Sequence, residues 1–261
     1  MKEKKKFAIL GSGNMGSAIA ASLPTDKYDI VCTAATDKTL DRISKDLPGI
    51  SVTLDNRKAV SDADIIVLAI KPYLAAEVIE EVLPEIKQGS LILSVMAGIS
   101  LDDLSSLLKA DEKKLNVMRV MPNTAIRLGK SVTFICHYPN AAPDAVAEAE
   151  QIFNLSGKAF IIPEKNMGAC MALASCGIAY FLRFIRAAAE GSVELGLRPG
   201  FATEVAALTA EGAAALLADG SHPEVEIDKV TTPGGFTIKG LNALEQHGMT
   251  YAVIAALKAS I

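Results

Sequence analysis

The chain has 261 residues, a net charge of −4 and 21% charged residues. That charge argues against a protein whose main role is to hold nucleic acid, because such domains are usually basic. Half of the residues are hydrophobic, which is enough for a large core in one or two domains. The cysteines show neither metal-ligand nor C-x-x-C spacing, so we expect no metal site and a reducing, cytoplasmic environment. They are Cys32, Cys136, Cys170 and Cys176.

Two apolar stretches bear on secretion and membranes. The run after the basic start ends at Leu10, whereas a signal peptide needs about 7–15 apolar residues there. The longest uncharged stretch, 166–182, is shorter than the ~20 residues of a membrane span. The sequence therefore predicts a buried helix here, and neither secretion nor residence in a membrane.

The first part of the chain alternates strand and helix patterns. Such alternation indicates βαβ units around a parallel sheet, an α/β architecture. Strands are expected at 7–10, 29–33, 50–53, 63–70, 90–95, 115–120 and 131–136, and helices at 14–23, 36–47, 73–86 and 100–109.

The pattern changes after Pro163. Strand signals stop, and Ala- and Gly-rich helical segments follow at about 165–195, 200–218 and 235–258. We therefore expect an α/β domain at 1–163, for which the glycine-rich loop described next predicts nucleotide binding, and an all-α domain at 164–261. Apolar helical faces in excess of what one small domain can bury predict at least a homodimer.

Residues 11–16 read GSGNMG and match G-x-G-x-x-G between a predicted strand and a predicted helix. Gly11 would allow a tight turn, Gly13 a close approach of the backbone to a pyrophosphate, and Gly16 close packing of helix and strand. Amides at the helix N-terminus would then hold the phosphates. The alternative is a plain glycine-rich turn. Six residues are expected to contact the cofactor: Gly11, Ser12, Gly13, Asn14, Met15 and Gly16.

The end of the second predicted strand bears on the choice of cofactor. An NAD site usually carries Asp or Glu there for the ribose 2′-hydroxyl, but positions 33–36 hold no acid. Ala34 occupies this tip, and Thr33, Thr36 and Lys38 could take a 2′-phosphate. The sequence therefore favours NADPH, with NADH possible. The alternative is that Thr36 is only a helix N-cap and Lys38 a solvated lysine.

Further candidates follow other strands, because ligands of such sheets lie at the carboxyl ends of the strands. Lys71 could lie over the cofactor ribose, the small residues at 96–98 leave room for a nicotinamide ring, and Asn123 and Thr124 offer neutral hydrogen bonds. Asn56 lies on the adenosine side. The cofactor residues expected here are Asn56, Ala69, Ile70, Lys71, Pro72, Ala97 and Gly98.

A turn in the second half resembles an anion site. Thr232-Pro-Gly-Gly-Phe-Thr237 leads into a predicted helix, and the amides of 235–237 would suit a small carboxylate. The alternative is an ordinary helix start after a Pro-Gly turn. No Ser-His-Asp or Cys-His arrangement is evident, and hydride transfer to an already protonated C=N bond needs no strong protein acid.

These motifs, in this order and spacing, resemble the pyrroline-5-carboxylate reductases over nearly the whole chain. The similarity rests on GSGNMG (11–16), AIKP (69–72), MAG (96–98), MPNT (121–124), SCGIAY (175–180) and DKVTTPGGFTIKGL (228–241). The resemblance implies a Rossmann domain and a helical dimerisation domain. It also implies reduction of 1-pyrroline-5-carboxylate to L-proline, usually with NADPH.

The resemblance also implies roles for residues of the second domain. Thr237 would lie near the imine nitrogen and orient it, and Glu164 matches a position near the substrate more loosely. The substrate-binding residues implied are Glu164, Thr232, Pro233, Gly234, Gly235, Phe236 and Thr237. Ile178 and Phe236 depart from the family pattern and bear on substrate size. Ala125 is a further departure, where the family usually has proline.

Three alternatives stay open on sequence alone. One is an imine reductase with another substrate. A 3-hydroxyacid dehydrogenase is the second, although the segment 166–182 lacks the lysine that alcohol chemistry would use as a base. The third is a non-catalytic NADP-binding regulator, which would need no anion turn. Turnover of NADPH with an imino acid separates the regulator from the enzymes.

Overall fold

The computed structural model describes residues 4–261. The chain divides into two compact units, Met1–Cys170 and Met171–Ile261. The first contains a β-sheet with helices and the second contains helices, which confirms the fold class expected from the sequence.

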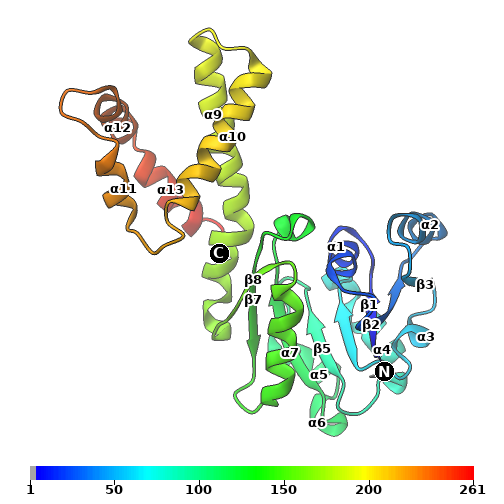
Figure 1. Ribbon diagram of the computed structural model, residues 1–261. Coiled ribbons are helices and arrows are strands. Elements are labelled where there is room, and N and C mark those ends of the chain that lie inside the picture. Colours follow the sequence, from blue (N-terminus) through cyan, green and yellow to red (C-terminus); the bar gives the residue numbers. More distant parts are fainter. Residues whose placement is uncertain (1–3) are drawn as a thin grey trace. The chain divides into compact units, whose positions relative to one another are not determined.

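One eight-stranded sheet forms the centre of the first unit, in the order β3-β2-β1-β4-β5-β6-β7-β8 (Figure 1). Neighbouring strands are parallel except β6 and β7. The strands are β1 (Lys5–Leu10), β2 (Tyr28–Thr33), β3 (Ser51–Thr53), β4 (Ile65–Leu68), β5 (Leu91–Ser94), β6 (Asn116–Met121), β7 (Ser131–His137) and β8 (Gly157–Ile161).

The antiparallel pair departs from the fully parallel sheet expected from the sequence. Between Met121 and Ser131 the chain forms only a short 3₁₀ turn, η3 (Thr124–Leu128). A parallel return needs a crossover of a dozen or more residues, usually a helix, so this short connection can only reverse the chain.

Helices flank the strands, and several were not predicted. Those at 14–23, 36–47, 73–86 and 100–109 appear with slightly different bounds, whereas α3, α6 and α7 had no counterpart in the sequence prediction. The helices of this unit are α1 (Asn14–Ser22), α2 (Asp37–Asp46), α3 (Asn56–Val60), α4 (Ala75–Val82), α5 (Leu101–Leu107), α6 (Ala110–Lys113), α7 (Pro143–Asn154) and α8 (Met167–Met171).

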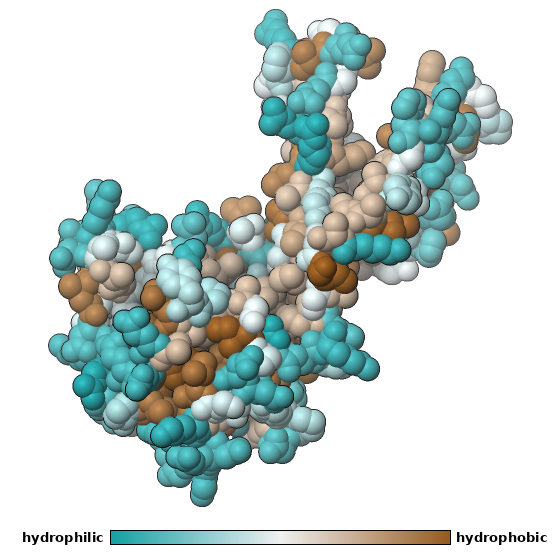
Figure 2. Space-filling view, turned by 180° about the vertical axis from the view of Figure 1, so that it is seen from behind, coloured by the Kyte–Doolittle hydropathy of each residue, from teal (hydrophilic) through white to brown (hydrophobic). Residues whose placement is uncertain are grey.

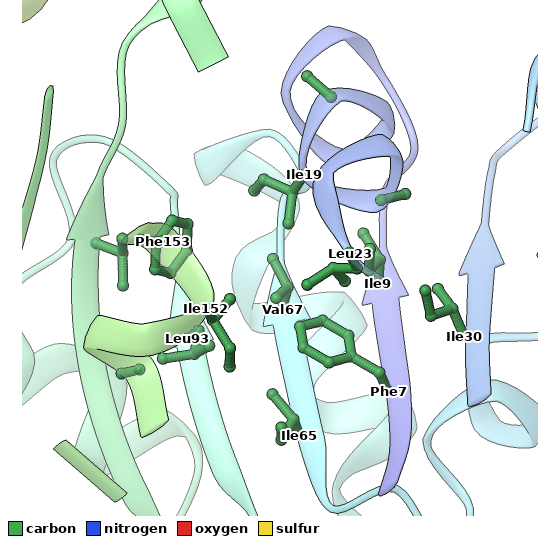
Figure 3. Packing of buried hydrophobic residues seen from close by; sticks show 14 of the residues in the cluster. Phe7, Ile9, Ile19, Leu23, Ile30, Ile65, Val67, Leu93, Ile152 and Phe153 are labelled. Carbon is green, nitrogen blue, oxygen red and sulfur yellow. The ribbon is translucent and has the colours of Figure 1, made fainter. Parts of the chain in front are cut away.

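The core explains why the central strands read as continuous apolar runs. Alternate side chains of β1 and β4, such as Phe7 and Val67, pack against Ile19 of α1 and belong to the cluster that also holds Phe153 of α7 (Figure 3). The residues between them, such as Ile66, face the other way and are also fully buried. Each such side chain contributes roughly 1.5–3 kcal/mol by leaving water.

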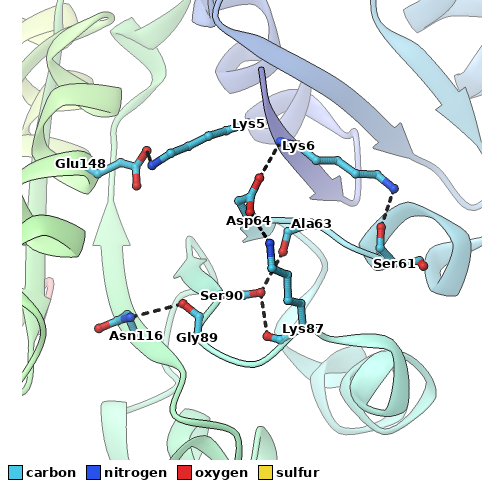
Figure 4. Close-up of polar contacts among 10 residues, drawn as sticks. All are labelled: Lys5, Lys6, Ser61, Ala63, Asp64, Lys87, Gly89, Ser90, Asn116 and Glu148. Atoms are coloured by element: carbon cyan, nitrogen blue, oxygen red, sulfur yellow. Dashed lines mark hydrogen bonds and ion pairs between the residues drawn. The ribbon is translucent and has the colours of Figure 1, made fainter. Parts of the chain in front are cut away.

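Polar groups at the amino-terminal ends of the parallel strands are paired with one another (Figure 4). Asp64, just before β4, accepts the backbone N–H of Lys6 at 3.0 Å and the ammonium of Lys87 at 2.6 Å. Burial alone would raise the pKa of Asp64, but the hydrogen bonds from Lys87 and Lys6 outweigh it and hold the pKa below its usual value. Ser90 donates to the Ala63 carbonyl oxygen at 2.8 Å. These groups satisfy one another, so the opposite, carboxyl edge is the place to look for a ligand site.

The second unit consists of helices. The segment predicted as one helix at 235–258 is broken at Gly248, whose φ of 75° is in the left-handed region. A π-helical turn, Ala172–Cys176, precedes the long α9. Tyr180 of α9 and Ser260 share a hydroxyl hydrogen bond of 2.5 Å. The helices are α9 (Gly177–Glu194), α10 (Pro199–Ala215), α11 (Pro223–Lys229), α12 (Phe236–Gln246) and α13 (Met249–Lys258).

Large apolar side chains reach the surface of this unit, where brown and tan residues appear among the hydrophilic ones (Figure 2). By length and composition alone, the helical segment Glu164–Glu194 could cross a membrane, but a single helix of this kind is weak evidence for a membrane span. The sequence predicted a buried helix at 166–182, whereas only 11% of the most apolar window of this segment is buried. The exposed apolar residues on α9 and α10 include Phe181, Leu182, Phe184, Phe201 and Leu208.

Candidate functional site

The glycine-rich loop connects β1 to α1 as a tight cradle. Gly11 has φ +92°, and a Cβ there would lie 2.8 Å from the Ala69 carbonyl oxygen. A Cβ on Gly16 would lie 2.2 Å from the Gly11 carbonyl oxygen, so helix and turn touch backbone to backbone. At Gly13 an added Cβ meets nothing within 4 Å, and α1 begins there without a side-chain cap. The cradle therefore keeps space beside Gly13 and leaves the first amides of α1 to a ligand, which fits the pyrophosphate of a dinucleotide.

The end of β2 is hydrogen-bonded directly to this cradle. The Ser12 N–H donates to the Thr33 carbonyl oxygen at 2.8 Å, and the Gly11 N–H to the Thr33 hydroxyl at 3.2 Å. Thr33 is only 2% exposed, so its hydroxyl holds the loop rather than facing a ligand. Thr36 caps α2 by accepting the Thr39 N–H. Ala34 follows the strand and is buried, and Lys38 is exposed on the first turn of α2.

The other expected cofactor residues gather at the same edge of the sheet. Ala69 donates its N–H to the Leu10 carbonyl oxygen at 2.8 Å, which places the segment 69–72 beside the cradle. Lys71 is exposed where that segment turns into the 3₁₀ turn η1 (Pro72–Leu74). Asn56 opens α3 and donates to Glu81 at 3.1 Å.

The loop after β5 is fixed at both ends. The Met96 N–H donates to the Ser94 hydroxyl at 3.4 Å, and Gly98 turns the chain with φ +79°. At the far end the Leu101 N–H donates to Glu164 Oε1 at 2.8 Å. This loop holds Ala97 and Gly98, the residues expected beside a nicotinamide ring.

Glu164 is engaged by protein groups rather than free. Its Oε1 accepts a hydrogen bond from Arg119 Nη1 at 2.5 Å as well as the Leu101 N–H. The Arg119 side chain on β6 is 13% exposed and that of Glu164 is 32% exposed. The carboxylate therefore joins β6, the start of α5 and the 3₁₀ turn η4 (Glu164–Asn166), a structural task that the sequence did not predict.

The turn before α12 has the geometry expected of an exposed helix start. Gly234 has φ +68°, and a Cβ on Gly235 would lie 2.5 Å from the Thr232 hydroxyl oxygen. Gly235 caps α12 without a side chain, so no protein group caps the first amides at Phe236 and Thr237 from that position. Phe236 is 93% exposed. The residues of the turn therefore leave these amides available to a small carboxylate.

Other candidate reactive groups are occupied or buried. Burial raises the pKa of Cys32 and of Cys136 to about 11, so neither thiol is a ready nucleophile. His222 caps α11 by accepting the Glu224 N–H at 3.3 Å. Within residues 4–261, no group of three or more His, Cys, Asp or Glu side chains is placed to hold a metal ion.

Two arginines beside the cradle were missed by the sequence analysis. Arg42 of α2 donates to the Ser12 carbonyl oxygen at 3.1 Å, and Arg127 of η3 to the Asn14 side-chain oxygen at 3.4 Å. Both line a cavity of about 480 Å³ between α1, α2 and η3. Only a weak signal was available, namely a basic residue on the helix that follows the second strand.

Comparison with known proteins gives consistent matches for both halves of the chain. Residues 164–261 match the family model described as pyrroline-5-carboxylate reductase dimerisation, and residues 6–98 match one described as NADP oxidoreductase, coenzyme F420-dependent. A protein of Dictyostelium discoideum named pyrroline-5-carboxylate reductase 2 is 37% identical over 98% of this chain and 91% of its own length. A pyrroline-5-carboxylate reductase of Methanosarcina acetivorans is 34% identical, covering 98% and 95%.

Solved structures agree with these sequence matches. A pyrroline-5-carboxylate reductase of Coxiella burnetii has a TM-score of 0.89 and 27% identity, covering 99% of this chain and 96% of its own. A pyrroline carboxylate reductase of Plasmodium falciparum, solved with NADP bound, has a TM-score of 0.85 and 25% identity over the same shares of the two chains.

Proposed function

The chain belongs to the pyrroline-5-carboxylate reductase family, and on that premise we propose that it reduces 1-pyrroline-5-carboxylate to L-proline with NADPH. The glycine cradle is the observation that carries the proposal. A Cβ on Gly16 would overlap the turn at Gly11, whereas the space at Gly13 is open, as a bound pyrophosphate requires. The comparisons add the reaction and the cofactor class, because the relatives are named for this reaction and one was solved with NADP.

The residues of the cradle and of the neighbouring strand ends would hold the cofactor. We assign the pyrophosphate to the backbone at 11–16, the adenosine side to Ala34, Thr36 and Asn56, and the nicotinamide side to the segment 69–72 with Ala97 and Gly98. NADPH, when bound, supplies a hydride to the imine carbon. The C=N electron pair then returns to a nitrogen that is already protonated, so the protein need not supply a strong acid.

The turn at Thr232–Thr237 would hold the substrate. Exposed amides at a helix start suit the carboxylate, and the Thr237 hydroxyl can then hydrogen-bond the ring nitrogen and orient it. Losing one such positioned donor typically lowers the rate by ~10²–10³ where charge changes in the transition state. We also assign Pro233, Gly234, Gly235 and Phe236 of this turn to the substrate site. Glu164 remains a candidate substrate residue, although its hydrogen bonds with Arg119 and Leu101 favour a structural role.

NADPH oxidation with 1-pyrroline-5-carboxylate tests the activity, and a pair of variants tests the turn. We expect Thr237→Ala to lose most of kcat while NADPH binding and melting temperature stay near those of the unmodified protein. Thr232→Ala should lose less. If Thr237→Ala lowers the melting temperature but leaves kcat unchanged, Thr237 only stabilises the start of α12 and has no role in the reaction.

We further propose that the active unit is at least a homodimer in the cytoplasm. The match to a dimerisation family over 164–261 and the exposed apolar side chains of α9 and α10 support association. The four cysteines are free thiols, which fits a reducing compartment. Sedimentation of active enzyme tests the assembly, and a fully active monomer at high dilution would contradict it.

A further inference from the structure

The 3₁₀ turn η3 packs against α1, the helix that follows the glycine cradle. Ile126 of η3 is 3% exposed and belongs to the same core cluster as Ile19 of α1. One residue further along, Arg127 Nη2 donates to the side-chain oxygen of Asn14, the first residue of α1, at 3.4 Å. A buried side chain and a polar one thus hold η3 against the start of α1.

The turn η3 is itself fixed to the sheet through Asn123 and Ser131. The Asn123 N–H donates to the Ser131 hydroxyl at 3.2 Å, and the Asn123 side-chain oxygen accepts the Ala125 N–H at 3.1 Å. Ser131, at the start of β7, is 1% exposed and shares a hydroxyl hydrogen bond of 2.9 Å with Thr133. Its N–H donates to the Ser156 carbonyl oxygen at 2.9 Å. These buried bonds hold η3 in one position relative to the sheet.

The contact with Arg127 determines which way the Asn14 carboxamide faces. A guanidinium carries only hydrogen-bond donors, so the atom of Asn14 that it meets is the oxygen Oδ1. The two hydrogens on Nδ2 then lie at the other end of the carboxamide, and within residues 4–261 no group accepts a hydrogen bond from them. Asn14 is exposed at the start of α1, which no side chain caps and where the phosphates of a dinucleotide are expected.

The opposite orientation of Asn14 would not suit a phosphate. The phosphates of a dinucleotide carry no hydrogen to donate, so a carboxamide that presented its oxygen to them would bring two acceptors together. A free asparagine side chain can turn over about its last bond, whereas one whose oxygen is held by an arginine donor keeps Nδ2 on the far side. Arg127 therefore selects the orientation in which Asn14 donates.

We propose that Arg127 is a positioning residue for the dinucleotide, which orients Asn14 so that Nδ2 donates to a phosphate oxygen of the cofactor. The inference deepens the proposed function and rests on its dinucleotide site. In this role Arg127 contacts neither the substrate nor the reacting atoms, and it acts only through Asn14. Because the pyrophosphate is common to NADP⁺ and NAD⁺, the contribution is the same for both cofactors.

Binding of NADP⁺ and NAD⁺ to the full chain, without substrate, tests this role through a double-mutant cycle. We expect Arg127→Met to weaken both cofactors by the same factor, about 3- to 10-fold, as for the loss of one hydrogen bond. Asn14→Ala, which removes the donor itself, should weaken them at least as much. In the Asn14→Ala protein, Arg127→Met should change either affinity less than about twofold, because the residue through which it acts is absent.

Two controls separate positioning from a general effect of charge or stability. The matched control is Lys5→Met, which removes one positive charge at the opposite edge of the sheet, where Lys5 pairs with Glu148 at 2.6 Å. It should leave both affinities unchanged. The melting temperature of Arg127→Met should stay near that of the unmodified protein, because Arg127 is exposed.

Three results would overturn the proposal. If Arg127→Met weakens binding by the same factor with and without Asn14, the guanidinium acts on the phosphates through its own charge. If Arg127→Met leaves both affinities unchanged, the orientation of Asn14 does not depend on it. If NADP⁺ alone binds more weakly, Arg127 acts on a group that NAD⁺ lacks and not on the pyrophosphate.

The measurements separate this proposal from the proposed reaction. If the cycle gives the expected coupling but the protein leaves 1-pyrroline-5-carboxylate unreduced, the positioning role stands and the substrate assignment fails. If the protein reduces the imine but Arg127→Met and Asn14→Ala act independently on cofactor binding, the reaction stands and the positioning role fails.

Discussion

Replacing Glu164 by alanine separates a structural role from a substrate-binding one. The substitution removes the carboxylate that accepts Arg119 at 2.5 Å and the Leu101 N–H at 2.8 Å. Charge-assisted hydrogen bonds contribute about 1.5–3 kcal/mol, and leaving a buried charge unpaired costs ~3–5 kcal/mol. Because Glu164 is about a third exposed, water replaces part of the interaction, and we expect a loss of about 2 kcal/mol.

That loss should lower the melting temperature by roughly 4–8 °C for a unit of this size. Thermal unfolding of the free protein measures it, with Glu85→Ala as the control. Glu85 pairs with Arg57 at 3.2 Å in the same unit, but both side chains are well exposed, so the control should lose less than ~1 kcal/mol. Glu164→Gln keeps an acceptor for Leu101 and should fall between the two.

Kinetics supply the result that would refute this reasoning. If Glu164 supports the loop after β5, its loss should weaken NADPH binding together with stability, because Leu101 ends that loop. If Glu164→Ala melts like the unmodified protein and raises only the KM for 1-pyrroline-5-carboxylate, the carboxylate is a substrate ligand and the structural reading is wrong.

Three further substitutions test other parts of the site and fold. Gly13→Ala should keep the melting temperature but weaken NADPH binding about tenfold or more in a fluorescence titration. Gly16→Ala should lower both the NADPH affinity and the melting temperature, because its Cβ would meet the Gly11 carbonyl oxygen. A Gly13→Ala protein that binds normally would show that no phosphate lies against that backbone. Asp64→Asn should be less stable than the unmodified protein at pH 7. The lowered pKa of Asp64 gives stability above the unfolded value of about 3.9, so the difference should vanish as pH falls through the lower folded pKa.

The sequence predicted those features that depend on local chemistry. The cradle at 11–16 follows from glycine geometry, and seven of the eight strands follow from apolar runs. The strand β8 was not predicted, although it too is a short apolar run. The helix α7 was missed although Pro143 stands at its first turn and Ile152 and Phe153 face the core. Its start signal is weak, and its buried side is defined only by the sheet that it covers.

Features that depend on distant contacts could not be predicted. Whether Thr33 faces a ligand or the loop depends on the register between β1 and β2, and Arg42 reaches Ser12 only because α2 packs beside the cradle. The reversal between β6 and β7 follows from the short connection between them. The length of that connection can be read from the sequence, but predicting the strands one at a time takes no account of it. The engagement of Glu164 joins residues 45 and 63 positions apart.

The apolar surface of the helical unit should make the lifetime of the chain in a cell depend on its concentration. Side chains such as Phe181 and Phe201 are exposed to water in a single copy, and the proposed dimer would bury such side chains and remove the cost of that exposure. In such a dimer, folding and assembly share one equilibrium, so the melting temperature should rise with protein concentration. In a cell that expresses little of this protein, a newly made chain would remain unassembled for longer and be exposed to chaperones and proteases. The concentration of the protein would then determine what fraction of chains assembles before it is degraded.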